Sequence, residues 1–237
     1  MKKIAIFVEG QTEQIFVNKL LKEIAGQRKI SINLFQLRGG SKTPIKQIYV
    51  PQSITNPTNP KYEALIYDSG SDSKVKSDIL DNIQSLAGRG YSQIIGLRDL
   101  YPLDLSKLHN LEQGMLFFPQ SYLPLPLDID FVIAVSEVEA WFLGECNHYE
   151  CIDSVLLPSF LISNLSYDPC TIDTSTRTVP SDDLKSIYQL VGKTYNKKKD
   201  IVERTVECLD YANLYLNVRN RVPKLGQFID LVDAFLD

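Results

Sequence analysis

The first half of the chain alternates short apolar runs with stretches of helical periodicity. Continuous apolar runs predict five strands, at residues 4–8, 32–37, 64–67, 94–97 and 131–135. Runs of this length, bounded by polar turns, are typical of strands buried on both faces of a parallel sheet. The pattern therefore indicates an α/β core in this part of the chain.

Two segments between these runs carry apolar residues three and four positions apart. They predict helices at about residues 12–25 and 73–87. Strands that alternate with helices form right-handed βαβ units and a mainly parallel sheet. Residues 51–60 are polar and rich in proline, and they predict a loop.

The second half has a different character. After about residue 150 the chain carries Pro, Ser and Thr turns, followed by helical patterns at about 198–211 and 225–236. We predict an α/β fold with a mostly parallel sheet flanked by helices over residues 1–145. A mainly helical C-terminal region, residues 146–237, is expected to pack on the same core.

Composition narrows the class of protein. Hydrophobic residues make up 44% of the 237 residues, which is enough for a real core and argues against disorder. The net charge of −4 differs from the positive net charge that is typical of nucleic-acid-binding proteins. That argument is weak for enzymes that approach phosphates through metal ions, because an acidic metal site lowers the isoelectric point.

We expect no secretory leader, because only five apolar residues separate Lys3 from Glu9, and no membrane span, because no apolar stretch is long enough. We therefore expect a cytoplasmic protein with reduced thiols. Its cysteines are Cys146, Cys151, Cys170 and Cys208. With His148 they offer zinc ligands, but the spacing is not that of structural zinc sites, and buried free thiols are the competing interpretation.

Acidic residues stand where the predicted strands end: Glu9, Asp68, Asp99, Glu137 and Glu139. Because parallel strands present their carboxyl ends at one edge of the sheet, we expect these carboxylates to converge there. Hard cations such as Mg²⁺ and Mn²⁺ prefer oxygen ligands. The pattern predicts a divalent-metal site, with Glu9 and Asp99 as the catalytic residues.

Each acid also has a plainer interpretation. A single Asp or Glu at a strand end commonly caps the following helix or lies in a solvated loop, as Asp68 could. Glu137 and Glu139 share one face on a strand but diverge on a helix. Glu9 is followed directly by Gly10, which lets the chain turn sharply and favours a functional role. The apolar residues of the Glu137 segment are expected to be buried: Val138, Trp141 and Phe142.

Basic residues offer contacts to phosphate. Arg38 and Lys42 flank a Gly-rich stretch after the second strand, which lacks the spacing of a P-loop. Lys193 and Lys197 belong to a basic segment near the C-terminal helices. We predict that these four residues bind phosphate, and an ordinary turn and a solvated face are the alternatives.

Three blocks of the chain resemble a known family. They are Ile6-Phe7-Val8-Glu9-Gly10-Gln11-Thr12-Glu13, Asp99-Leu100-Tyr101-Pro102 and Glu137-Val138-Glu139-Ala140-Trp141-Phe142. The first is similar to the opening strand of TOPRIM-type proteins. The ordered set resembles the TOPRIM-like family catalogued as domain of unknown function 4276, which is kin to nuclease domains of the OLD type. A weaker block follows at Lys193, Tyr195, Lys197 and residues 212–216.

This resemblance implies a metal-dependent phosphodiesterase or nuclease that acts on nucleic acid in phage defence or DNA repair. The implied partners are nucleic acid and either an ATPase or a second copy of the chain, with no membrane. TOPRIM domains carry Asp-x-Asp, whereas here Leu100 and Tyr101 follow Asp99, and Asp68 is the substitute ligand. The competing interpretation is a degenerate TOPRIM-like sensor or partner-binding protein.

Overall fold

The structure is a computed structural model that describes residues 1–38, 48–55 and 57–237. These residues form two compact units. The first unit comprises Met1–Arg98, Ser106–Ile133 and Val232–Asp237, and the second comprises Asp99–Leu105 and Ala134–Leu231. The predicted division into residues 1–145 and 146–237 stays a prediction.

The first unit is built on a six-stranded sheet in the order β3-β2-β4-β1-β5-β6. The strands are β1 (Lys2–Val8), β2 (Ile30–Arg38), β3 (Ile48–Thr55), β4 (Tyr62–Asp68), β5 (Gln93–Asp99) and β6 (Asp128–Ala134). β1 pairs in parallel with β4 and β5, and β2 pairs in parallel with β4. The predicted α/β fold with a mostly parallel sheet is confirmed.

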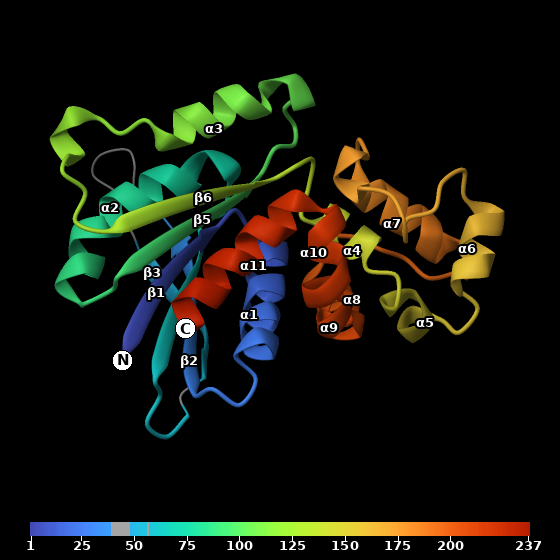
Figure 1. The fold of residues 1–237 in the computed structure, drawn as a ribbon, viewed down its shortest axis with the longest axis horizontal. Helices are drawn as coiled ribbons and strands as arrows, with labels where there is room; N and C mark the ends of the chain where they lie inside the picture. Colours follow the sequence, from blue (N-terminus) through green and yellow to red (C-terminus); the bar gives the residue numbers. More distant parts are fainter. Residues whose placement is uncertain (39–47, 56) are drawn as a thin grey trace. The chain divides into compact units, whose positions relative to one another are not determined.

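Helices cover both faces of this sheet. Side chains alternate along β1, so Ala5 and Phe7 face a cluster that includes Ile79 of α2 (Val75–Gly88). The intervening residues of β1 are equally buried and point to the opposite face. Figure 1 shows α2 and α1 (Gln11–Ala25) on opposite sides of the sheet. Burial on both sides explains why β1 is a continuous apolar run.

The predicted loop at residues 51–60 is wrong in its first half, because β3 extends to Thr55. β3 is the edge strand of the sheet and pairs antiparallel with β2, with a register shift between Leu34 and Phe35. An edge strand tolerates Pro51, since only one of its sides must supply hydrogen bonds. The proline signal was therefore mistaken for a break in the strand.

A segment between β5 and β6 forms α3 (Leu108–Leu116), which the sequence pattern did not predict. Only Met115 of this helix is buried. A helix that contributes one side chain to the core leaves little apolar periodicity in the sequence. Short 3₁₀ turns complete this unit at Asp72–Lys74, Leu105–Lys107 and Gln120–Tyr122, the second of them running across the division.

The second unit is helical, as predicted. Its elements are α4 (Glu139–Gly144), α5 (His148–Ile152), α6 (Pro158–Asn164), a 3₁₀ turn (Thr174–Thr176), α7 (Pro180–Gln189), α8 (Lys199–Cys208), α9 (Tyr211–Asn213), a π-helix (Leu214–Val218), α10 (Arg219–Arg221) and α11 (Pro223–Leu236). The last residues of α11 belong to the first unit. Val138, Trp141 and Phe142 are fully buried, which confirms that expectation.

The cysteines correct another prediction. The structure pairs Cys146 with Cys170 and Cys151 with Cys208, with Cα–Cα distances of 5.5 and 5.6 Å. The expected reduced thiols are therefore wrong, and the disulfides use the sulfurs that a zinc site would need. Spacings of 24 and 57 residues gave no signal, because only the folded chain brings these pairs together.

Within the described ranges, no helix has both the length and the apolar character that crossing a membrane requires.

Candidate functional site

The carboxyl ends of three adjacent strands place acidic and basic groups together in the first unit. Val8, the last residue of β1, pairs with Asp68 of β4 on one side and with Leu97 of β5 on the other. Glu9 follows Val8 directly and is partly exposed. The parallel register therefore sets Glu9 beside the end of β4, where Asp68 stands.

Asp68 is buried at this edge and held from two sides. Its Oδ1 accepts a hydrogen bond from the backbone N–H of Gly70 at 2.8 Å, and its Oδ2 accepts one from Nε2 of Gln36 at 3.1 Å. Burial raises the pKa of Asp68 above its usual range, and these hydrogen bonds and Arg38 only partly offset that effect. A nearby cation would stabilise the ionised form of this buried carboxylate.

The turn from β1 into α1 is tightly organised. The backbone N–H of Gly10 donates to Oε2 of Glu13 at 2.9 Å, and Gly10 is the N-cap residue of α1. Glu13 is buried and thus serves this turn. Glu13 therefore stabilises the start of α1, whereas Glu9 lies at the edge of the sheet.

Arg38 and Arg98 bring positive charge to the same end of the strands. Nε and Nη2 of Arg38 donate to Oε1 of Gln36 at 3.1 and 2.9 Å, and Gln36 in turn contacts Asp68. Arg98 pairs with Asp72 at 2.9 Å and is largely buried. Lys42, the other predicted phosphate contact of this segment, lies outside the described residues.

The sequence pattern does not predict Arg98 as a site residue, because only the acid that follows it, Asp99, matches the chemistry expected of a metal ligand. The available signal was an arginine in the last positions of a buried strand, where an apolar residue is expected. A guanidinium buried there needs a fixed anion, and Asp72 after the β4 turn supplies it.

The second unit gathers a separate group of acids around one lysine. Nζ of Lys197 lies 3.0 Å from Oε1 of Glu137 and 3.4 Å from Oε1 of Glu139. The two glutamate side chains are 4% and 0% exposed, whereas that of Lys197 is 48% exposed. Tyr195 donates to Oε1 of Glu139 at 2.9 Å, and the backbone N–H of Ser181 donates to Oε2 of Glu137 at 3.0 Å.

The charges in this group depend on one another. Burial raises the pKa of Glu139, and the charge of Lys197 works against that rise. Burial alone would lower the pKa of Lys197, but Glu139, Glu137 and Asp99 outweigh it, so the net shift is upward. Lys197 therefore remains an ammonium ion at neutral pH and does not act as a nucleophile.

Asp99 has a defined partner in the second unit. Its Oδ1 accepts a hydrogen bond from the backbone N–H of Val138 at 2.9 Å, just before α4 begins. Asp99 is buried and holds the segment that carries Glu137 and Glu139. Lys193, predicted to bind phosphate, is exposed on the chain before Tyr195.

The predicted site residues thus fall into two groups. The first unit places Glu9, Asp68 and Arg38 at one edge of the sheet. The second unit contains the other group: Asp99, Glu137, Glu139 and Lys197. The expected single site uniting Glu9 with Asp99 stays a prediction. Over residues 1–38, 48–55 and 57–237, no group of three or more His, Cys, Asp or Glu side chains is arranged to hold a metal ion.

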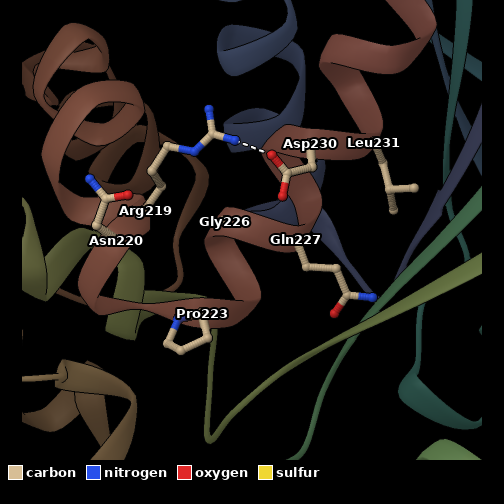
Figure 2. Close-up of a pocket in the computed structure, with 7 residues that line it drawn as sticks. All are labelled: Arg219, Asn220, Pro223, Gly226, Gln227, Asp230 and Leu231. Atoms are coloured by element: carbon tan, nitrogen blue, oxygen red, sulfur yellow. Dashed lines mark hydrogen bonds and ion pairs between the residues drawn. The ribbon is translucent and has the colours of Figure 1, made fainter.

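The second unit also has a hollow of about 620 Å³ beside α10 and α11. Figure 2 shows the guanidinium of Arg219 turned toward Asp230, with which it forms an ion pair. A Cβ on Gly226 would lie 2.8 Å from the carbonyl oxygen of Arg219, so glycine permits the close approach of α11 to α10. None of the residues predicted as functional lines this hollow.

An α/β sheet with carboxylates and arginines at its strand ends defines a class of fold in which ligands bind at that edge. Within it, the chain belongs to the family described as Domain of unknown function (DUF4276), whose model matches residues 8–230. A comparison with curated proteins and one with solved structures each found no match.

Proposed function

We propose that the protein is a divalent-metal-dependent phosphodiesterase that cleaves nucleic acid at the edge carrying Glu9 and Asp68. The observation that carries this proposal is the position of Glu9 and Asp68 at the ends of the adjacent parallel strands β1 and β4, with Asp68 buried and its pKa raised. Mg²⁺ is commonly held by one or two carboxylates together with substrate phosphates, and this edge fits that requirement.

In this account Glu9 and Asp68 would hold Mg²⁺ or Mn²⁺, which when bound would supply positive charge that stabilises the phosphate and lowers the pKa of a bound water. Glu9, partly exposed at the strand tip, takes the proton from the attacking water or contributes an oxygen ligand. Asp68 contributes an oxygen fixed by Gly70 and Gln36. Arg38 pairs with a phosphate oxygen.

The resemblance of the Glu9 block to TOPRIM-type proteins supports this chemistry. It also underlies the rest of the proposal: Asp99, Glu137 and Glu139 as further metal ligands, and a role in phage defence or DNA repair beside a partner ATPase or a second copy of the chain. A cytoplasmic location belongs to the same proposal, although disulfides are more typical of oxidising compartments.

One observation favours the competing proposal of a degenerate sensor or partner-binding protein. Lys197 already neutralises Glu137, and a backbone N–H of α7 occupies that residue's other oxygen. A carboxylate so engaged must give up both contacts before it can bind a metal ion. A sensor that retained the fold and lost catalysis would keep such contacts.

The test is cleavage by wild type and by Glu9→Gln. Single- and double-stranded DNA and RNA are incubated with Mg²⁺ and with Mn²⁺, and EDTA serves as the blank. We expect metal-dependent cleavage by wild type and none by Glu9→Gln, because Gln is nearly isosteric but carries no charge and is no base. Glu23→Gln, a partly exposed acid on α1 paired with Lys19, is the matched control and should cleave normally. Equal activity in Glu9→Gln would remove Glu9 from the mechanism, and no activity in any variant would favour the sensor.

A further inference from the structure

Lys197 is held in a fixed position by groups that are themselves fixed. Its ammonium has three N–H donors, and the carboxylates of Glu137 and Glu139 lie within reach of two of them, at 3.0 and 3.4 Å. Ser181 donates to the other oxygen of Glu137, and Tyr195 donates to the same oxygen of Glu139 that Lys197 approaches, so both carboxylates are held in place. The lysine therefore loses little conformational freedom when it binds a further anion with its remaining donor.

A cavity of about 290 Å³ lies directly beside this ammonium. Its lining consists of Ser181, Asp182, Lys185, Thr194, Tyr195, Asn196 and Lys197. Lys185 belongs to α7 and adds a second lysine to the lining, and four of the other residues carry a hydroxyl or an amide N–H. One carboxylate, Asp182, faces this set of donors. Walls made mostly of donors suit an oxyanion.

We propose that this cavity binds a backbone phosphate of nucleic acid, with Lys197 and Lys185 as the contacting cations. Glu137 and Glu139 are then positioning residues for Lys197. This role replaces their proposed role as further metal ligands and leaves the proposed metal site at Glu9 and Asp68 unchanged. The inference deepens the proposed function, on which it rests for the nucleic-acid substrate. It explains the two buried glutamates by the contacts that they already make with Lys197.

The alternative occupants of this cavity differ in measurable ways. A divalent cation would have to displace Lys197 from Glu137 and would meet two ammonium groups at close range. A free phosphate or nucleotide shares the chemistry of a backbone phosphate, so the experiment must separate these sources. Cleavage requires metal, but phosphate contact by lysine does not, and binding is therefore measured in EDTA.

The experiment is fluorescence anisotropy of a short labelled oligonucleotide, titrated at several salt concentrations in EDTA. We expect Lys197→Met to weaken binding by about tenfold. It should also reduce the slope of log K against log salt by about 0.7 for a single strand. Lys199→Met is the matched control, because Lys199 is exposed, pairs with Glu203 and does not line the cavity. It should bind as wild type.

Lys197→Met leaves two buried acids without their cation, so its fold must be verified by circular dichroism. Lys185→Met touches neither acid and should still weaken binding, and Lys197→Arg should restore most of it. Glu137→Gln should weaken binding while the salt slope is retained, because it displaces the ammonium without removing its charge. A merely structural Glu137 would lower thermal stability and leave affinity unchanged.

The inference is overturned if Lys185→Met binds as wild type while Lys197→Met is misfolded. It is also overturned if pyrophosphate binds through Lys197 and the oligonucleotide does not bind. Failure here is distinguishable from failure of the proposed catalysis. Metal-dependent cleavage by wild type with unchanged binding by a folded Lys197→Met would reject the cavity and keep the enzyme. Lysine-dependent binding without cleavage would do the reverse.

Discussion

Glu145 shows how one buried carboxylate can organise two helices of the second unit. Its Oε1 accepts hydrogen bonds from the backbone N–H of Asn147 at 2.9 Å and from Nδ2 of Asn213 at 2.7 Å. Its Oε2 accepts from the backbone N–H groups of His148 at 2.9 Å and Asp210 at 3.1 Å. The three backbone donors lie at the starts of α5 and α9, where backbone N–H groups need acceptors.

Glu145→Gln should lower the free energy of unfolding at pH 7 by about 3 kcal/mol, because an amide NH₂ would face two backbone donors. Burial alone would raise the pKa of Glu145, but the hydrogen bonds and charge of His148, with Asn213 and Asp210, hold it below 4.5. The stability from this ionised group is therefore present above pH 4.5 and is lost as the pH falls through the lower folded-state pKa.

Urea unfolding of wild type and variant at pH 7 and at pH values below 4.5 checks both statements. The gap between the two proteins should narrow as the pH falls. Glu150→Gln removes an exposed acid from α5 and should change stability by less than about 0.5 kcal/mol. A gap that is constant with pH would mean that the charge of Glu145 does not contribute.

At the scale of elements, a close approach between β5 and β6 depends on a glycine. A Cβ on Gly96 would lie 2.6 Å from a ring carbon of Phe131 and 3.0 Å from Cδ1 of Ile79. Gly96→Ala should destabilise the protein by about 1–3 kcal/mol, because both neighbours must move. Thermal unfolding measures the effect.

Gly114 in α3 serves as the control, because an alanine there is expected to stabilise the protein. A Cβ there meets no atom within 4 Å, and the residue lies inside a helix. Gly114→Ala should stabilise by about 0.5–1 kcal/mol through reduced backbone freedom in the unfolded chain. Gly96→Ala as stable as wild type would show that the packing of Phe131 on β5 is looser than described.

Elements with strong periodicity were predictable, and elements governed by context were not. β1 and α2 carry unbroken apolar patterns because both contribute many side chains to the core. β3 contains Pro51, and the sequence pattern predicts a loop over residues 51–60, because it does not reveal that a strand lies at an edge. α3 was missed because most of its side chains are exposed.

The candidate site likewise has features that local sequence pattern predicts and features that depend on residues far apart in the chain. The strand-end position of Glu9 and Asp68 follows from local pattern, because parallel strands share one carboxyl edge. The partner of Glu137 does not, since Lys197 is 60 residues further along the chain. Sequence alone predicted both residues as functional but assigned the glutamate to metal and the lysine to phosphate, without relating them.

For the whole molecule, the two disulfides close loops of very different length within the second unit. Both start near α5, and they join it to Cys170 and to the end of α8 at Cys208. Cross-links of this kind stabilise by roughly 3–4 kcal/mol each through restriction of the unfolded chain. Reduction with a thiol should therefore lower the unfolding temperature.

Peptide mapping under non-reducing conditions should recover the pairs Cys146–Cys170 and Cys151–Cys208. The variant Cys151→Ser with Cys208→Ser should lose at least as much stability as Cys146→Ser with Cys170→Ser, because its loop is longer. Four free thiols in the native protein would contradict this pairing and restore the expectation of reduced cysteines.

The most direct test of the central claim is calorimetric titration of the purified protein with Mn²⁺, without nucleic acid. The account predicts that wild type and Glu23→Gln bind the ion, and that Glu9→Gln binds it at least about tenfold more weakly, because one of two oxygen ligands loses its charge. Affinity should also fall as the pH is lowered, since protonation of Asp68, whose pKa is raised, competes with the cation. Identical Mn²⁺ isotherms for wild type and Glu9→Gln would contradict the assignment of this strand edge as a metal site.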